Sequence, residues 1–272
     1  MTTSSKTWTE AIVEAAGTRL QLVTGGTGEP LLILHGEMGH PGWLRFHEAL
    51  AQQYALSIPS HPGFGRSARL DWIMTMRDLA GWYLDALDEL GFQQVDVVGF
   101  SLGGWLAAEM AAMCPHPFRK LVLVDAPGIR PPSGAIYDIF LEVAKECLTA
   151  GFLDPAHTGE FQTVCPDQPA PEQVEAWEVA REEACRLSWK PYMHDPALPH
   201  LLHRVRGLPT LIVWGRQDAI VPLSVGEVYR QSIHGSRLAV LEGCGHYPEI
   251  EKADEFVRLV QAFLAEGEAG AG

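Results

Sequence analysis

The sequence has too few basic residues to balance its acidic ones. It contains 20 lysine and arginine residues against 34 aspartate and glutamate residues, which gives a formal net charge of −14 at pH 7 over 272 residues. A protein of this sign is repelled by nucleic acid and by anionic membrane surfaces, and it disfavours polyanionic ligands. We therefore expect no nucleic acid and no membrane among its partners.

Long apolar runs and paired cysteines are missing as well. No uninterrupted apolar run approaches the roughly 18 residues needed to cross a bilayer, and residues 1–6 lack the apolar segment of a secretion signal. No C-x-x-C spacing occurs among the five scattered cysteines, Cys114, Cys147, Cys165, Cys185 and Cys244. This pattern is typical of reduced thiols in a cytoplasmic protein without a zinc site. Residues 267–272 have the composition of a frayed tail.

Short apolar runs alternate with helical patterns along most of the chain. Continuous apolar stretches such as 31–34 and 121–124 are expected of strands that helices cover on both faces. Further strands are predicted over 8–15, 19–24, 54–58, 95–98, 209–215 and 238–241. Helices are predicted over 43–53, 75–90 with Thr75 as the cap, from 102, from 223, and over 252–265. This alternation predicts an α/β fold with a mostly parallel, eight-stranded sheet and helices on both of its faces.

The alternation stops between residues 127 and 206. No strand pattern occurs there, and helical segments near 135–150 and 171–188 are separated by prolines. We therefore predict two domains. Residues 1–126 and 207–272 form the core, and 127–206 form a helical cap inserted into it.

The most informative stretch joins the strand at 95–98 to the helix that begins at Leu102. Ser101 stands at this corner, with Gly99 and Gly103 two residues to either side. A side chain at either glycine would collide with the neighbouring strand or helix, so the pattern indicates a tight turn that exposes the serine hydroxyl. The backbone N–H of Leu102, at the helix N-terminus, is placed to hold a developing oxyanion. We predict that Ser101 is a nucleophile.

A serine hydroxyl needs a base to take its proton, and histidine has the pKa for that task. Of 11 histidines, His246 is favoured because it lies in a glycine-rich turn after the last strand. Asp218 follows the strand at 209–215 and is the first candidate for the carboxylate that orients the imidazole, while Asp125 is its rival. No metal is expected, because the histidines of the cap show no ligand spacing typical of a metal site.

The order Ser101, Asp218, His246 resembles that of the α/β-hydrolase superfamily. The resemblance extends from about residue 20 to 265 and includes His35-Gly36, the Pro62–Ser67 loop, Gly215–Asp218 and Gly243–His246. It implies the α/β-hydrolase fold with a cap, a second oxyanion donor in the backbone N–H of Glu37, a bracing role for His35, and no cofactor. Ser60 is a departure, since relatives often carry aspartate there.

The expected chemistry is acyl transfer, in which Ser101 attacks a carbonyl and His246 moves the proton. We expect kcat to fall below about pH 6–7 as His246 becomes protonated. A carboxylesterase acting on a small apolar ester is the first hypothesis, and a lactonase, including one for N-acyl-homoserine lactones, follows closely.

Two other functions stay open. Carbon–carbon bond (meta-cleavage product) hydrolases of this family usually have a Gly-Asn-Ser-Met-Gly-Gly elbow and a tryptophan after the histidine, where this chain has Phe100 and Tyr247. The family also includes small-ligand receptors with little or no turnover. The sequence does not fix whether the protein is a monomer or a homodimer. The predicted substrate pocket consists of Trp43, Phe100, Trp105, Tyr137, Trp189 and Tyr192.

Overall fold

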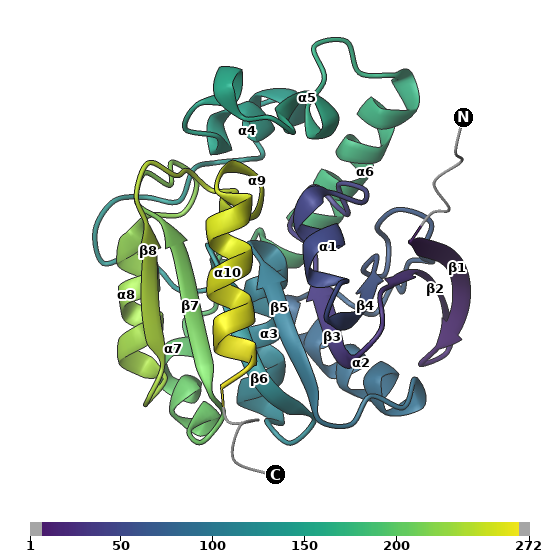
Figure 1. Cartoon of the computed structure of the whole chain (residues 1–272), viewed down its shortest axis with the longest axis vertical. Coiled ribbons are helices and arrows are strands. Elements are labelled where there is room, and N and C mark those ends of the chain that lie inside the picture. The colour runs from purple at the N-terminus through teal and green to yellow at the C-terminus, as the bar shows by residue number, and fades with distance from the viewer. Residues whose placement is uncertain (1–6, 267–272) are drawn as a thin grey trace.

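A computed structural model of the chain describes residues 7–266, so the predicted tail at 267–272 lies outside the described residues (Figure 1). Its strands are β1 (Trp8–Ala15), β2 (Thr18–Gly25), β3 (Glu29–Leu34), β4 (Tyr54–Pro59), β5 (Val95–Phe100), β6 (Phe118–Val124), β7 (Thr210–Gly215) and β8 (Arg237–Leu241). They form one eight-stranded sheet in the order β1-β2-β4-β3-β5-β6-β7-β8. β2 pairs antiparallel with β1 and β4, and every other pairing in the sheet is parallel. The predicted fold class is confirmed.

Helices cover both faces of this sheet (Figure 1). Those of the core are α1 (Arg45–Leu50), α2 (Met76–Glu89), α3 (Leu102–Met113), α8 (Leu223–Ser232), α9 (Pro248–Glu251) and α10 (Ala253–Leu264). Successive residues of a strand point to opposite faces, and β3 shows the result. Leu32 and Leu34 pack with α2, α3 and α8 in one apolar core, while Leu31 and Ile33 pack with α1 and α10 in the other. The unbroken apolar runs are therefore those of strands buried on both sides.

Two predicted helices are shorter than expected. The segment predicted as 43–53 is helical only over α1, because Leu44 is extended and its N–H donates to the side chain of His47. The segment predicted as 135–150 is helical only over α4 (Ala144–Gly151). Ahead of α4, the N–H of Tyr137 donates to the carbonyl of Ile220 and that of Ile139 to the Tyr192 hydroxyl. These tertiary hydrogen bonds replace the helical ones.

Residues 127–206 contain no strand in the described structure, only helices. These are α4, η1 (Pro155–His157), α5 (Phe161–Val164), α6 (Pro171–Ser188), α7 (Leu198–Leu201) and η2 (Leu202–Val205). α4 and α5 stand above the sheet at the end where the parallel strands point (Figure 1). α7 and η2 instead pack against α3 and α8 of the core. The cap boundary at 206 stays a prediction, and these contacts favour an earlier end of the cap.

Within residues 7–266, no helix has both the length and the apolar character needed to cross a bilayer.

Candidate active site

Ser101 occupies the corner between β5 and α3. Its backbone has φ 45° and ψ −117°, a conformation that residues other than glycine seldom adopt. A Cβ added at Gly99 would lie 2.4 Å from the Gly103 carbonyl oxygen, and one at Gly103 would lie 2.3 Å from that of Leu34. The expected need for glycine at both positions is confirmed. The strained turn is therefore held by close backbone packing on both sides of the serine.

A continuous hydrogen-bond chain joins Ser101 to His246 and Asp218. Ser101 Oγ lies 3.0 Å from His246 Nε2, and His246 Nδ1 lies 2.8 Å from Asp218 Oδ2. Because a carboxylate only accepts hydrogen bonds, the neutral imidazole carries its proton on Nδ1, and Nε2 accepts from the serine hydroxyl. The side chains of His246 and Asp218 have no solvent exposure. The structure thus brings together three residues that are far apart in sequence.

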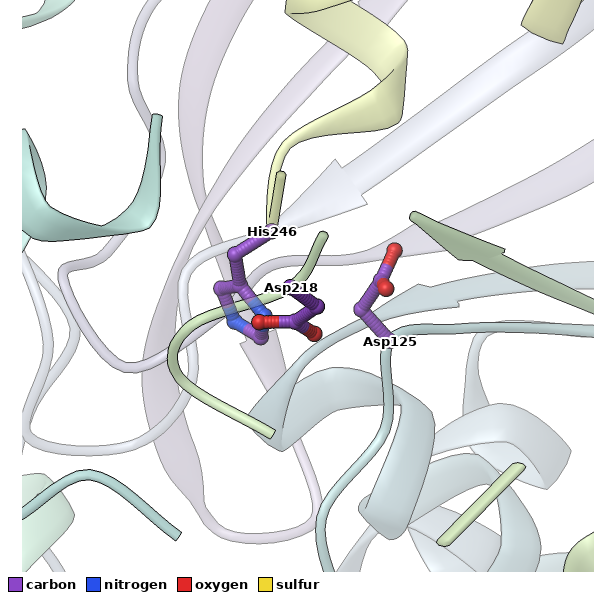
Figure 2. Close-up of side chains that lie close together, drawn as sticks. All are labelled: Asp125, Asp218 and His246. Atoms are coloured by element: carbon purple, nitrogen blue, oxygen red, sulfur yellow. The ribbon is translucent and has the colours of Figure 1, made fainter. Parts of the chain in front are cut away.

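Asp218 is held by its own loop, and Asp125 lies behind it. Asp218 Oδ1 accepts from the backbone N–H groups of Ile220 and Val221 at 2.8 and 3.0 Å. Figure 2 shows the Asp218 carboxylate between the imidazole of His246 and the Asp125 side chain. Asp125 Oδ1 accepts from the Gly215 N–H at 2.9 Å. The rival carboxylate is therefore a neighbour of Asp218, and Asp218 is the one that touches the histidine.

The electrostatic setting distinguishes the two carboxyl groups and the base. Burial, and then the negative charge of Asp218, raise the pKa of Asp125 well above its ordinary value. Burial lowers the pKa of His246, but its ion pair and hydrogen bond with Asp218, helped by the charges of Glu37 and Glu249, outweigh this and raise it to about 9. This shift favours an activity loss at a higher pH than the expected 6–7, and the pH dependence of kcat stays a prediction.

The three residues Asp125, Asp218 and His246 each offer a ligand atom within 4.8 Å of the others. Such a set can in principle hold a metal ion. Here Nδ1 of His246 is already hydrogen-bonded to Asp218, and it donates that bond as an N–H group. A metal at this position would have to displace the proton, so the geometry fits a hydrogen-bond relay better than a metal site.

The loop after β3 lies directly against Ser101. A Cβ added at Gly36 would lie 3.3 Å from Cβ of Ser101. Leu102 is the first residue of α3, where a backbone N–H has no acceptor within the helix. Glu37 and Leu102, the two predicted oxyanion donors, therefore flank the serine. Their action on a substrate oxygen stays a prediction.

A buried pair of histidines braces that loop. His35 Nε2 accepts from the N–H of His61 at 3.0 Å, so Nδ1 carries the proton and donates to the Gly36 carbonyl at 2.7 Å. His61 Nε2 donates to the His35 carbonyl at 3.1 Å, and its Nδ1 accepts from the Tyr83 hydroxyl at 2.6 Å. Burial lowers the pKa of both histidines, which keeps them neutral. The geometry supports the bracing role expected for His35.

The 59–67 loop is held without an aspartate at position 60. The Ser60 N–H donates to the Gln21 carbonyl at 2.9 Å, and its carbonyl accepts from Ser67 Oγ at 2.6 Å. Ser67 Oγ in turn accepts from the Gln21 N–H at 2.9 Å. Ser67 and β2 thus supply the support that the family aspartate would give.

One cavity opens onto Ser101. It contains about 680 Å³ of space not filled by atoms, and this figure includes open solvent at its mouth. Its apolar wall consists of Ile33, Met38, Phe46, Ile58, Phe100, Val124, Leu148, Phe152, Val164 and Ile250. Its polar side chains are His35, Glu37, His40, His47, Ser101, His246, Tyr247 and Glu249. Leu148, Phe152 and Val164 come from α4, α5 and the chain between them, so the segment above the sheet contributes part of the wall.

Only Phe100 of the six predicted pocket residues lines this cavity. Trp43 instead stacks on Trp8 at 5.9 Å and donates to Glu48. Trp105 points into the core on the other face of the sheet and donates to Glu109 at 3.2 Å.

The remaining three predicted pocket residues lie away from the cavity, in the segment 137–192. The Tyr192 hydroxyl donates to the carbonyl of Tyr137, and Phe140 lies between Trp189 and Tyr192 at centroid distances of 5.9 and 5.7 Å. These aromatic rings pack on one another, and Trp189 is 55% exposed. The five residues Trp43, Trp105, Tyr137, Trp189 and Tyr192 therefore lie outside the wall of this cavity, and their contact with a substrate stays a prediction.

Sequence reasoning missed the residues around the histidine loop. Glu249 lines the cavity and is 6% exposed, and burial raises its pKa to about 8. The N–H of His246 donates to the carbonyl of Gly151 at the end of α4, at 2.7 Å. The Glu251 carboxylate accepts from the N–H groups of Leu153 and Gly245 at 2.8 and 2.9 Å. The only signal for these contacts in the sequence is the polar Glu249-Ile-Glu251 stretch directly after the histidine motif.

Comparison with known proteins places this geometry in a family. The model of the alpha/beta hydrolase family matches residues 31–259. A 2-hydroxymuconate semialdehyde hydrolase of Pseudomonas putida is 30% identical over 94% of each chain. A protein of the same name from Pseudomonas sp. (strain CF600) is 31% identical with the same coverage. A solved bacterial membrane phospholipase A superposes with a TM-score of 0.79 at 24% identity, over 97% of this chain and 88% of that one, and so shares the fold. The chain therefore belongs to the α/β-hydrolase family.

Proposed function

We propose that this protein is a serine hydrolase that cleaves a bond at the carbonyl carbon of a small, mainly apolar molecule. The observation that carries the proposal is the hydrogen-bond chain from Ser101 through His246 to Asp218. Ser101, at one end of this chain, lines an apolar cavity. A nucleophile, a base in contact with it and a carboxylate that orients the base are the parts this chemistry requires.

In the proposed mechanism, His246 Nε2 takes the proton of the Ser101 hydroxyl as Oγ attacks the carbonyl carbon. The imidazolium that forms keeps its Nδ1 proton bonded to Asp218, which stabilises the positive charge. The N–H groups of Leu102 and Glu37 stabilise the oxyanion of the tetrahedral intermediate. His246 then returns its proton to the leaving group, and water repeats the sequence on the acyl-enzyme.

For the bond that is cleaved, we propose a carbon–carbon bond next to a ketone. Two curated relatives that align over 94% of both chains are named 2-hydroxymuconate semialdehyde hydrolases, which supports this choice. Here the leaving group is a carbanion, which must acquire a proton as the bond breaks. Protonated His246 is in position to give it.

A carboxylic ester, including a lactone, is the second candidate. It is favoured by Phe100 and Tyr247, which line the cavity where the carbon–carbon hydrolases usually have asparagine and tryptophan. It is also favoured by the absence of lysine and arginine among the described residues that line the cavity, since the carboxylate of a muconate would find no cation there.

One experiment separates these reactions. We would compare kcat/KM for a ring-fission dienone carrying a neutral acyl end, followed by loss of its visible absorbance, with that for p-nitrophenyl esters of increasing chain length and a homoserine-lactone panel. The proposal predicts the highest value for the dienone, and a higher value for an ester or lactone would select the second candidate. Ser101→Ala should lower kcat by about 10⁶-fold, whereas Ser133→Ala, on the exposed surface, should not.

A fluorophosphonate probe tests the enzyme class itself. It should label Ser101 covalently, as measured by mass spectrometry of the intact chain, and fail to label Ser101→Ala. An unlabelled serine together with no turnover of the ketone, ester and lactone panels would contradict the hydrolase proposal and favour a ligand receptor.

A further inference from the structure

Two carboxyl side chains of the cavity have unsatisfied oxygen atoms. Glu37 and Glu249 are 3% and 6% exposed, and both line the cavity that contains Ser101. In each of them, Oε2 is buried and has no hydrogen-bond partner. Buried polar atoms without a partner are rare in proteins and require an explanation. The proposed chemistry uses the backbone N–H of Glu37, and the side chain of Glu37 takes no part in that chemistry.

The imidazole of His246 interacts electrostatically with these carboxyls, but the carboxylate bonded to it is that of Asp218. Among the described residues that line it there is no lysine or arginine. Burial lowers the pKa of His35, His40 and His47, so these histidines are uncharged near neutral pH. His246 is paired with Asp218. Two acidic groups therefore face an apolar cavity whose other polar side chains are neutral or already paired.

The remaining polar contacts do not supply a partner either. His40 Nδ1 accepts from the Gly42 N–H at 3.3 Å, and His47 Nδ1 accepts from the Leu44 N–H at 3.0 Å. Both rings therefore accept hydrogen bonds from the backbone of the loop before α1. Burial raises the pKa of Glu249 to about 8, because its effect outweighs the lowering by the charge of His246.

Resting on the proposed function, we infer that Glu37 and Glu249 form a subsite that binds an ammonium group of the substrate beside the reactive carbonyl. An ammonium group has three N–H donors and a positive charge, so it would satisfy both unpaired oxygens and favour the ionised form of Glu249. The substrate class is then a carbonyl compound with an amine at one end and an apolar chain lining the rest of the cavity. A carboxylate at the same place would be repelled.

Binding tests this subsite without any need for turnover. We would measure by calorimetry the affinity of the Ser101→Ala protein for pentan-1-ammonium, pentan-1-ol and pentanoate, three ligands of similar length that differ in charge. We expect the ammonium to bind about 10- to 100-fold more tightly than the alcohol, the range for a hydrogen bond to a charged group, and pentanoate to bind most weakly. Equal affinity for ammonium and pentanoate would overturn the inference.

Substitution of each glutamate tests whether that residue causes the preference for ammonium over alcohol. Glu37→Gln and Glu249→Gln, each in the Ser101→Ala background, should lose about tenfold or more of the preference for ammonium over alcohol. Glu160→Gln should keep the preference, because Glu160 also has an unpaired buried oxygen but lies outside the cavity. A preference that survives both cavity substitutions would refute the subsite, as would its loss in the Glu160 variant.

Kinetics keeps this inference separate from the proposed function. On the enzyme with Ser101 intact, p-nitrophenyl 6-aminohexanoate should have a lower KM than the heptanoate, and Glu37→Gln should raise the KM of the amino ester by a larger factor than that of the heptanoate. Turnover of both esters with equal KM values would refute the subsite and leave the hydrolase standing. Ammonium binding without turnover of the ketone, ester and lactone panels would refute the hydrolase and leave the subsite standing.

Discussion

The roles of Asp218 and Asp125 can be separated by the same substitution at each position. Asp218 Oδ2 contacts His246 Nδ1 at 2.8 Å, whereas Asp125 contacts the Gly215 N–H and lies behind Asp218. An asparagine at 218 would face the imidazole with an amide and favour the wrong tautomer. We expect Asp218→Asn to lower kcat by about 10⁴-fold, equivalent to about 5.4 kcal/mol of transition-state stabilisation.

Asp125→Asn should behave differently, because the Asp125 carboxyl already tends to be neutral. Burial and the nearby Asp218 charge raise its pKa well above the ordinary value, and an asparagine copies the protonated acid in shape and charge. Its oxygen can still accept from the Gly215 N–H. We expect kcat to stay within about tenfold of the unsubstituted enzyme, since no contact to the histidine is lost.

Stability gives this comparison a second measurement. A carboxyl with a raised pKa in the folded state contributes stability at low pH that is lost as pH rises through that pKa, by about 1.4 kcal/mol for each unit of the shift. Asparagine does not titrate, so Asp125→Asn should remove this loss. Urea unfolding should show the variant gaining stability over the unsubstituted protein between pH 4 and pH 9.

The assay is kcat on the preferred substrate at a pH where the unsubstituted enzyme is fully active, with circular dichroism to confirm folding. The reasoning would be refuted if Asp125→Asn lost about 10⁴-fold while Asp218→Asn stayed active. It would also be refuted if the two losses were equal in folded proteins.

Three further predictions concern the same site. The kcat/KM of a neutral substrate should rise with pH through a midpoint above 6.5 and toward about 9, because His246 must lose its proton to act as a base. A profile of kcat/KM from pH 5 to 10 checks this prediction. A midpoint at 6.5 or below would contradict it. Gly36→Ala, whose Cβ would lie 3.3 Å from Cβ of Ser101, should displace the oxyanion loop and lower kcat by about 10²- to 10³-fold, with little change in the midpoint of urea unfolding. Gly103→Ala, with its Cβ 2.3 Å from the Leu34 carbonyl oxygen, should destabilise the fold by about 1–3 kcal/mol or more in the same urea assay, and an unchanged midpoint would show that the turn is not tightly packed.

The elements that carry local signals could be predicted from the sequence. Apolar runs located the inner strands to within a few residues, because strands covered on both faces must be apolar throughout, and alternation located β1 and β2. The glycines around Ser101 indicated the elbow because only glycine fits such close backbone contacts. The threonine before α2 marked its start, and Thr75 does accept from the Asp78 N–H at 3.1 Å.

The walls of the cavity could not be predicted, for a physical reason. All residues of α3 from Leu102 to Ala112 are buried, so apolar spacing gave no direction for Trp105. The aromatic residues of the segment 137–192 pack on one another, and only the tertiary fold decides which of them reach the substrate. Glu249 resembles an ordinary charged residue at a helix start until the surrounding chain is folded over it.

The hydrogen bond from the His246 N–H to the carbonyl of Gly151 has a mechanical consequence. This bond joins the last turn of α4 to the loop that carries the imidazole. The Glu251 carboxylate joins the same two segments again, because it accepts from the N–H groups of Leu153 and Gly245. If α4 moves outward to admit a ligand, either these hydrogen bonds break or the imidazole moves away from the serine. Opening of the cavity and the contact between His246 and Ser101 are thus mechanically linked. The serine would be activated only while α4 stays closed over the cavity.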